Sequence, residues 1–149
     1  MALLQGFYKP QNPQKYKGDI KQIVYRSSYE LSFLTRLDND KDVIQYSSEE
    51  VIVPYRDPVD KRLRRYFCDF YVKRKLGDKI VEQLIEIKPY VQTIPPVLTG
   101  TKKKKKTLLN EVYTFALNQA KWDAARTYCA RRGWEFIIMT EKELGIGPR

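Results

Sequence analysis

The amino-acid sequence predicts an α/β fold in which a single domain is built around one mixed β-sheet. A chain of 149 residues fits one domain. Two stretches repeat apolar residues with helical spacing, and several short stretches between and after them are rich in β-branched and aromatic residues. In chain order these features predict a helix, three antiparallel strands, a second helix and a final strand.

The N-terminal part of the chain differs from the rest. Residues 1–19 mix aromatic, proline and basic residues without a sustained period, and we expect an extended arm that wraps either the domain or a partner. Residues 20–149 are expected to form the globular domain, beginning with a short strand at residues 20–25. Ser27 followed by Glu30 fits a capping box, which predicts a helix from this point to about Asp38.

The three antiparallel strands are expected in the middle of the chain. They fall at Glu50–Tyr55, at residues 64–74 and at residues 80–88. A turn that contains proline separates the first two, and the tight turn "LGDK" separates the second from the third. This close order favours strands that are neighbours in one sheet.

A long helix and a final strand complete the expected domain. A proline-rich loop ending in five consecutive lysines leads to a helix expected from about Thr107 to Arg132. The apolar positions near one face of this helix are Leu108, Val112, Phe115, Trp122, Ala125 and Cys129. The final strand is expected at residues 134–140, where Thr140 with Glu143 predicts a second capping box.

Composition excludes several classes of enzyme and favours a polyanionic partner. The chain has no histidine, which removes Ser-His-Asp and Cys-His catalysis, HNH-type nucleases and nearly all catalytic zinc sites. A net charge of +10 suggests DNA, RNA or an acidic membrane surface as partner, although such a charge can also serve solubility alone. Cys68 and Cys129 lack CxxC spacing and are expected to be free thiols. No segment approaches the about 20 apolar residues of a membrane span, so no membrane partner is expected.

Charged residues interrupt two strands that should be apolar. Glu86 and Lys88 are two positions apart in "LIEIKPY" and therefore point to the same face of a strand. Asp69, on the preceding strand, can face Glu86 across the antiparallel ladder. Two carboxylates can bind Mg²⁺ and leave positions open for water and a phosphate, while a lysine beside them positions the attacking water. The alternative is an ion pair on a solvated sheet edge, so the pattern suggests a metal-dependent phosphodiesterase without deciding for it.

These residues also carry a family resemblance. Asp69 followed by Glu86-Ile87-Lys88, after a helix that carries Glu30, resembles the PD-(D/E)XK nuclease superfamily, although "FCD" stands where that superfamily usually has proline before the aspartate. The longer stretches "PVDKRLRRYFCDFYV", "LIEIKP" and "NQAKWDAARTYCARRGWEFIIMTEKEL" are similar to the head completion nucleases of T-even-type phages. A more distant similarity connects the chain to the endonuclease subunits of Tn7-type transposition. The resemblance implies a restriction-endonuclease-like domain with an αβββαβ core.

The resemblance implies specific roles for these residues. The protein would be a Mg²⁺-dependent DNA endonuclease, with Mn²⁺ able to substitute, that leaves 5′-phosphate and 3′-hydroxyl ends. Asp69 and Glu86 would be metal ligands together with the Ile87 carbonyl, and Lys88 would orient the attacking water. Glu30 would be a further acid at the metal site, but its position in the capping box explains it equally well without catalysis.

The resemblance also suggests the substrate and the setting. We expect double-stranded DNA to be bound by Lys102, Lys103, Lys104, Lys105, Lys106, Gln119 and Lys121. The lysine run can instead be a solvated loop, and the two helix residues can belong to packed or solvated faces. The protein would act on the packaged DNA end before tail attachment, with phage portal or neck proteins as partners, in the host cytoplasm or the virion neck. The alternatives are a transposase-associated or repair endonuclease and a non-catalytic DNA-binding neck protein.

Overall fold

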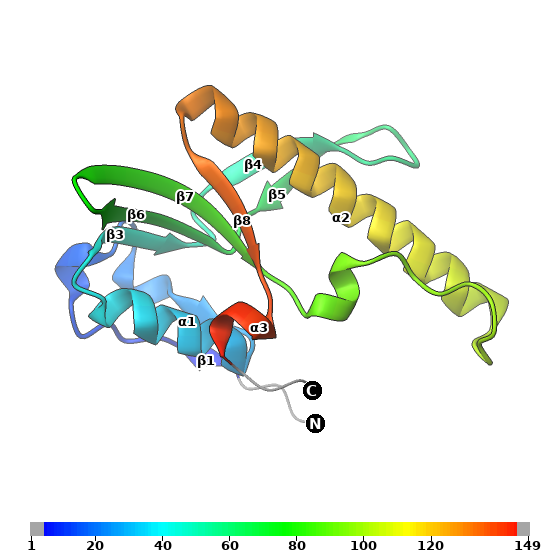
Figure 1. Cartoon of the computed structure of the whole chain (residues 1–149), viewed down its shortest axis with the longest axis horizontal. Helices are drawn as coiled ribbons and strands as arrows, with labels where there is room; N and C mark the ends of the chain where they lie inside the picture. The colour runs from blue at the N-terminus through cyan, green and yellow to red at the C-terminus, as the bar shows by residue number, and fades with distance from the viewer. Residues whose placement is uncertain (1–4, 146–149) are drawn as a thin grey trace.

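A computed structural model describes residues 5–145, whose centre is a four-stranded mixed β-sheet (Figure 1). The strands, in the order in which they lie side by side, are β3 (Val43–Ser48), β6 (Phe70–Leu76), β7 (Lys79–Ile87) and β8 (Glu135–Met139). The first three are antiparallel to their neighbours, and β8 runs parallel to β7. The fold is therefore of the α/β class with one mixed central sheet, as the sequence predicts.

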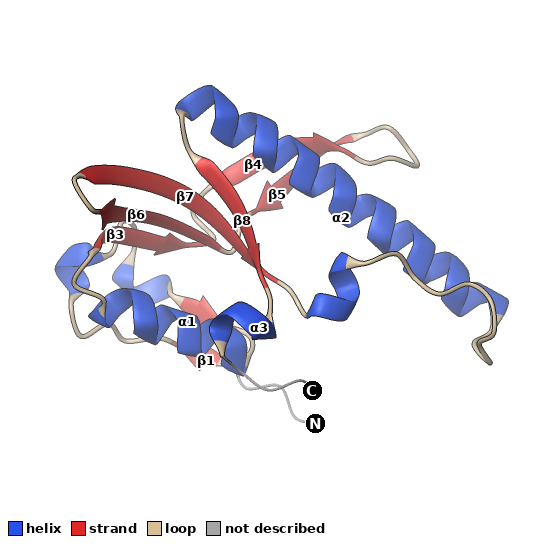
Figure 2. Ribbon diagram, viewed as in Figure 1, coloured by secondary structure: helices blue, strands red, loops and turns tan. Residues whose placement is uncertain are grey.

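Helices cover both faces of this sheet (Figure 2). On one face lie α1 (Ser28–Asn39) and the short α3 (Glu141–Leu144), and on the other lies α2 (Lys105–Arg132). Alternation along the strands divides the core accordingly. Phe70, Val72, Ile85 and Ile87 pack with α1, whereas Tyr71 and Leu84 pack with α2.

The order of elements agrees with the expected helix, three strands, helix and strand, but the identity of the first strand was wrong. No strand was expected at Val43–Ser48, where β3 lies at the edge of the central sheet. The expected strand at residues 64–74 is broken at Cys68 and Asp69 into two strands of different sheets, opposite Glu49, whose φ of 57° bends the paired chain. Cys68 N–H donates to the Val51 carbonyl (3.1 Å), and the Asp69 carbonyl accepts from Glu49 N–H (3.0 Å).

The residues between β3 and β6 form a separate two-stranded hairpin of β4 (Ile52–Arg56) and β5 (Leu63–Phe67). The expected strand Glu50–Tyr55 is therefore a hairpin strand and not part of the central sheet. The hairpin packs on α2, where the side chains of Val53, Tyr55 and Tyr66 join the core on that face. Its turn is fixed by the buried Asp57, which accepts hydrogen bonds from Tyr113 Oη (2.6 Å) and Arg64 Nε (3.0 Å).

The described part of the N-terminal arm lies against the domain. Strand β1 (Gly6–Phe7) pairs with β2 (Val24–Tyr25), and Tyr16 is buried in the core beside α1. The buried Asp38 accepts hydrogen bonds from Tyr8 Oη and from the backbone N–H groups of residues 11 and 12. The expected strand at residues 20–25 is wrong in its first half, which is a 3₁₀ turn (Ile20–Gln22) whose Lys21 N–H is capped by the Asp19 carboxylate. Residues 1–4 and 146–149 lie outside the described part of the chain.

Helix α2 is longer than expected and projects beyond the sheet (Figure 1). It begins at Lys105, inside the lysine run. The expected apolar face is buried in its C-terminal half at Trp122, Ala125 and Cys129. In the N-terminal half Val112 is exposed, because no strand of the central sheet lies beneath this part of the helix.

Two smaller expectations are confirmed. Thr140 and Glu143 form a complete capping box at the start of α3. Cys68 and Cys129 are free and buried. Among residues 5–145, no helix combines the length and apolar composition that crossing a bilayer requires.

Candidate active site

The charged residues singled out from the sequence meet where β7 ends and β6 begins. Phe70 pairs with Ile85, so Asp69 lies one position beyond that pair, at the level of Glu86. The Asp69 carboxylate accepts a hydrogen bond of 2.8 Å from the backbone N–H of Ile87. Asp69, Glu86 and Lys88 are thus brought together by the break between β5 and β6 and by the end of β7.

Glu86 is buried, and both of its carboxylate oxygens face partners. Its side chain lies on the α2 face of the sheet, because it follows Leu84 by two positions. Oε1 accepts a hydrogen bond of 2.6 Å from the hydroxyl of Tyr66, and Oε2 lies 3.7 Å from Nζ of Lys88. The orientation of this carboxylate is therefore defined from two sides, by a neutral donor and by a cation.

Asp69 lies in an environment that opposes its negative charge. Burial, and next the nearby charge of Glu86, raise the pKa of Asp69 well above its usual range. The Ile87 N–H and the ammonium of Lys88 act in the opposite direction without cancelling the first two effects. A buried carboxylate, Glu86, and a half-buried one, Asp69, with too little compensating positive charge form an arrangement that a bound cation would stabilise.

The donor set fits a cation that prefers oxygen ligands. Asp69 and Glu86 offer carboxylate oxygens, and the Ile87 carbonyl belongs to the residue between Glu86 and Lys88. Mg²⁺ is commonly held by one or two carboxylates and keeps several of its waters. In residues 5–145 no three acidic or cysteine side chains are grouped closely enough to share an ion, so Glu30 is not joined to the other two acids in a single cluster.

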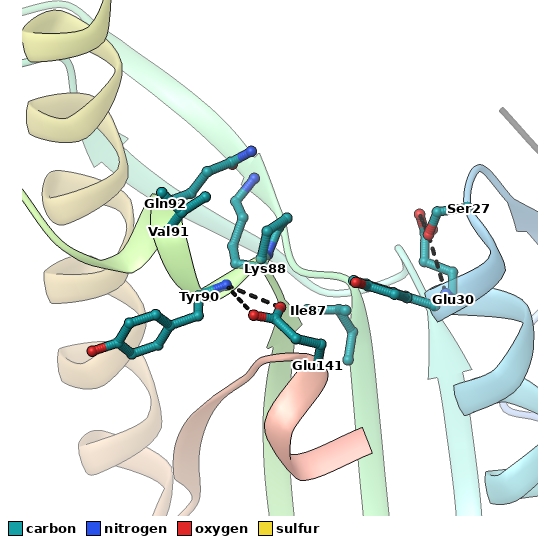
Figure 3. A pocket seen from close by; sticks show the side chains of 10 residues that line it. Ser27, Glu30, Ile87, Lys88, Tyr90, Val91, Gln92 and Glu141 are labelled. Carbon is teal, nitrogen blue, oxygen red and sulfur yellow. Dashed lines mark hydrogen bonds between the residues drawn. The ribbon is translucent and has the colours of Figure 1, made fainter. Parts of the chain in front are cut away.

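Lys88 and Ile87 line a cleft of about 480 Å³ beside these carboxylates (Figure 3). Glu30, Gln92 and Glu141 also line it. The segment after Lys88 is a short 3₁₀ turn, and its first N–H, that of Tyr90, donates to both oxygens of Glu141 (3.1 and 3.2 Å). Helix α3 thereby holds the chain that leaves the site.

Glu30 reaches this cleft from α1, on the opposite face of the sheet from α2. Ser27 Oγ accepts from the Glu30 N–H (3.1 Å), as the capping box requires. In a complete capping box the Glu30 carboxylate would accept a hydrogen bond from the backbone N–H of Ser27. It instead accepts hydrogen bonds from the Ser27 hydroxyl (3.1 Å) and from the backbone of Arg26. Burial raises the pKa of Glu30, and its charge contributes to the raised pKa of Asp69, so the two acids are electrostatic neighbours.

Helix α2 brings one lysine to the site from the other face. The ammonium of Lys121 lies over the rings of Tyr66 (5.7 Å) and Tyr55 (5.8 Å). Burial, and next the charge of Lys88, lower the pKa of Lys121, whereas Glu86 and Asp69 raise it. Because Lys121 interacts electrostatically with Lys88, Glu86 and Asp69, it lies beside the site. Gln119, on the same helix, is half-buried.

The lysine run lies far from this site. Lys102–Lys106 are exposed at the projecting end of α2, and Lys103 Nζ pairs with Glu111 (2.6 Å). With an axial rise of about 1.5 Å per residue, Lys105 is roughly 24 Å along the helix from Lys121. The structure thus brings Glu30, Asp69, Ile87, Glu86, Lys88 and Lys121 into one region and leaves the five lysines outside it.

Reasoning from the sequence missed Tyr66, whose hydroxyl contacts Glu86. Tyr66 was expected on one continuous strand with Asp69, and that expectation does not indicate which residue the Tyr66 hydroxyl contacts. The available signal was weak: a tyrosine three residues before the aspartate, in a stretch rich in aromatic residues.

Two comparisons with known proteins agree on the kind of protein that this chain resembles. The family model described as "TnsA-like endonuclease N terminal" matches residues 40–141, which include Asp69, Glu86 and Lys88 but not Glu30. The chain is 40% identical over 141 residues to the head completion nuclease of Enterobacteria phage T4. That similarity covers 93% of this chain and 92% of the phage T4 protein.

Proposed function

The chain belongs to the family of TnsA-like endonuclease N-terminal domains, and on that premise we propose that it is a metal-dependent DNA endonuclease of the restriction-endonuclease-like fold. It hydrolyses phosphodiester bonds of double-stranded DNA and leaves 5′-phosphate and 3′-hydroxyl ends. The observation that carries this proposal is the pair of adjacent carboxylates, the half-buried Asp69 and the buried Glu86, with the ammonium of Lys88 beside them.

The two carboxylates are the residues that would hold the metal. Asp69, Glu86 and the Ile87 carbonyl offer oxygen ligands suited to Mg²⁺, for which Mn²⁺ can substitute. A divalent cation bound there would lower the pKa of a coordinated water and stabilise negative charge on the phosphate oxygens. Burial, and next the charge of Glu86, raise the pKa of Asp69, and this environment, which opposes an unpaired carboxylate, supports a cation at this position.

The remaining residues of the site bind and orient the substrate. Lys88 lies at the cleft with its ammonium near Glu86, where it can orient the attacking water and neutralise charge on the phosphate. Glu30 is a further acid on the other side of the cleft and can help to orient that water. Lys121, held on the rings of Tyr55 and Tyr66, and Gln119 bind the DNA backbone close to the cleaved bond, and Lys102–Lys106 bind it farther away.

The setting proposed for this activity is the completion of a phage head. The phage T4 relative is named a head completion nuclease, and the similarity extends over most of both chains. In this setting the protein processes the end of the packaged DNA before the tail attaches, in the host cytoplasm or in the virion neck, with portal or neck proteins as partners. A transposition-associated or repair endonuclease is the second candidate, favoured by the family match at residues 40–141. A neck protein that binds DNA without cleaving it is the third.

Cleavage assays separate the two nuclease candidates from the non-catalytic neck protein. Purified protein is incubated with supercoiled plasmid and with linear DNA, in Mg²⁺ or in EDTA. We expect cleavage by the wild type in Mg²⁺ only, and none by Glu86→Ala. Glu82→Ala is the matched control, because Glu82 lies on the same strand and also accepts a tyrosine hydroxyl, that of Tyr71. Absence of cleavage by the wild type on every DNA form would favour the non-catalytic neck protein.

A further inference from the structure

We infer that Tyr66 is a positioning residue, which holds the Glu86 carboxylate in the orientation needed to bind a divalent cation. This inference rests on the proposed function. It adds a residue from outside the central sheet to a site whose other members were identified from their spacing in the sequence.

The hydrogen bond between these residues joins two separate sheets. Tyr66 belongs to β5 of the hairpin, whereas Glu86 belongs to β7 of the central sheet. The hydroxyl of Tyr66 donates to Oε1 of Glu86 at 2.6 Å, and both residues are 5% exposed. A short hydrogen bond to a buried carboxylate is strong, because a charged acceptor strengthens it and water does not compete for it.

Geometry explains why this bond determines the direction of the carboxylate. The second oxygen, Oε2, lies 3.7 Å from Nζ of Lys88, the cation proposed to serve the reaction. Without the Tyr66 hydroxyl, Oε1 would lose its donor, and the carboxylate could rotate about its terminal torsion toward Lys88. Glu86 would then spend part of the time as the partner of Lys88 and would be less available as a metal ligand.

Lys121 strengthens this arrangement. Its ammonium lies 5.7 Å from the centre of the Tyr66 ring, within the range of a cation–π interaction. A cation over the ring draws electron density from the phenol, which makes the hydroxyl a better donor. The ring is also packed in the core next to α2, so its hydroxyl has little freedom to point elsewhere.

The chain provides a close match for a control. Tyr71 is also buried, packs in the same core, and donates its hydroxyl to a glutamate of β7, Glu82, at 2.5 Å. Glu82 lies four residues before Glu86 and away from the site. Tyr66→Phe and Tyr71→Phe therefore remove the same atom and the same kind of bond, and they differ in which glutamate loses its partner.

The test measures metal binding directly, by calorimetric titration of the full chain with Mn²⁺, and separately the Mg²⁺ concentration that gives half-maximal cleavage. For Tyr66→Phe we expect about tenfold weaker Mn²⁺ binding, within the range found for outer partners of metal ligands. The half-maximal Mg²⁺ concentration should rise by a similar factor, and saturating Mg²⁺ should restore much of the rate. Tyr71→Phe should equal the wild type in both measurements.

Several outcomes would overturn the inference. Wild-type Mn²⁺ affinity in Tyr66→Phe would do so, as would tighter binding, which would mean that the hydroxyl competes with the ion. Equal weakening by Tyr71→Phe would also do so, because the effect would then be one of general packing. The rise in Tm that Mn²⁺ causes, measured on the wild type, Tyr66→Phe and Tyr71→Phe, compares their Mn²⁺ binding even if one variant is destabilised. A wild type that neither binds Mn²⁺ nor cleaves DNA would overturn the proposed function itself, whereas loss of the Tyr66 effect alone would leave that function standing.

Discussion

The Asp69 carboxylate accepts a hydrogen bond of 2.8 Å from the backbone N–H of Ile87, the residue between Glu86 and Lys88. This bond connects the start of β6 to the end of β7 just where regular pairing between the two strands stops. It fixes Asp69 beside Glu86 although their negative charges repel. The structure therefore holds in place an arrangement that is electrostatically unfavourable without a cation, as expected of a site built for function rather than stability.

The first prediction follows from that repulsion. Asp69→Asn keeps the size of the side chain and an oxygen that can accept the Ile87 N–H, but it removes one of two neighbouring negative charges. We expect a higher Tm than the wild type in metal-free buffer near pH 7, together with a loss of Mg²⁺-dependent cleavage of roughly 100-fold or more, since even outer partners of metal ligands cost 10- to 100-fold.

Thermal melts with EDTA and cleavage of plasmid DNA measure these two effects. Asp78→Asn, in the β6–β7 turn, is the control and should change neither quantity. A variant at Asp69 that is less stable than the wild type, or that cleaves at its rate, would contradict the account of this carboxylate.

The second prediction concerns the anchor of the hairpin. Hydrogen bonds from Tyr113 and from the backbone N–H of Val59 lower the pKa of the Asp57 carboxyl below its usual range. Because this pKa is lower in the folded than in the unfolded chain, the stabilisation is complete above the ordinary carboxyl pKa of about 4 and is lost as the pH falls through the folded value. Tyr113→Phe, which removes the largest of these effects, should lower the Tm at pH 7 and lower it less in acid.

Melting curves between pH 7 and pH 3 test this dependence. Tyr128→Phe is a suitable control, because Tyr128 is on the same helix and its ring contacts are with Trp134 and Arg132. An equal loss of stability by Tyr113→Phe at all pH values would mean that the bond to Asp57 does not carry the effect.

The third prediction concerns the lysine run. If Lys102–Lys106 bind the DNA backbone, replacing them by serine should weaken binding to all sequences. The slope of log affinity against log salt should fall by roughly 0.9 for each phosphate that the variant no longer neutralises. The distance of roughly 24 Å along α2 corresponds to about seven base pairs at 3.4 Å each. Duplexes that extend fewer than about seven base pairs from the cleaved bond on that side should be bound equally by wild type and variant.

Fluorescence anisotropy with duplexes of graded length measures both effects. Serine at Lys75 and Lys79, exposed lysines at the opposite end of the molecule, is the control for a general loss of positive charge. An unchanged salt slope in the lysine-run variant would identify the run as solvated or as a contact for protein.

Local patterns predicted the parts of the fold that local interactions determine. Helices α1 and α2 follow from apolar periodicity and capping, and the end of β7 follows from alternation. Strand β3 was missed because its buried Ser47 and Ser48 resemble loop residues in the sequence. The break at Asp69 was missed because "YFCDFYV" is strand-like throughout. The break lies opposite Glu49, which adopts a left-handed backbone conformation (φ 57°) that cannot be recognised from a local sequence pattern.

The same distinction applies to the site. Asp69, Glu86 and Lys88 could be grouped from sequence because they lie on adjacent strands joined by a tight turn. Tyr66 could not be grouped with them, because its hydroxyl reaches Glu86 only through the packing of a hairpin that belongs to another sheet. Lys121 depends likewise on how α2 packs against that hairpin.

The last prediction separates two roles of Glu30. Its carboxylate accepts the Ser27 hydroxyl at 3.1 Å and the backbone of Arg26, and a glutamine oxygen can accept both bonds. A role at the metal or in orienting the attacking water instead requires the negative charge. The free energy of unfolding of Glu30→Gln should therefore lie within about 0.5 kcal/mol of the wild-type value, the usual range for a change that keeps its contacts. The variant should nevertheless cleave DNA much more slowly.

Glu30→Ala loses the accepting oxygens as well as the charge, so it should be slow in cleavage and also less stable by about 1 kcal/mol, the usual net contribution of a hydrogen bond. Ser27→Ala supplies the complementary control. It removes the helix cap and the hydroxyl that binds Glu30, so it should be less stable by a similar amount, about 1 kcal/mol, while it keeps the carboxylate and most of the activity.

If Glu30→Gln cleaves DNA at the wild-type rate, the role of Glu30 is confined to the start of α1. The site would then consist of Asp69, Glu86 and Lys88, because no other acid on the α1 face lines the described cleft except Glu141, which is engaged by the Tyr90 N–H.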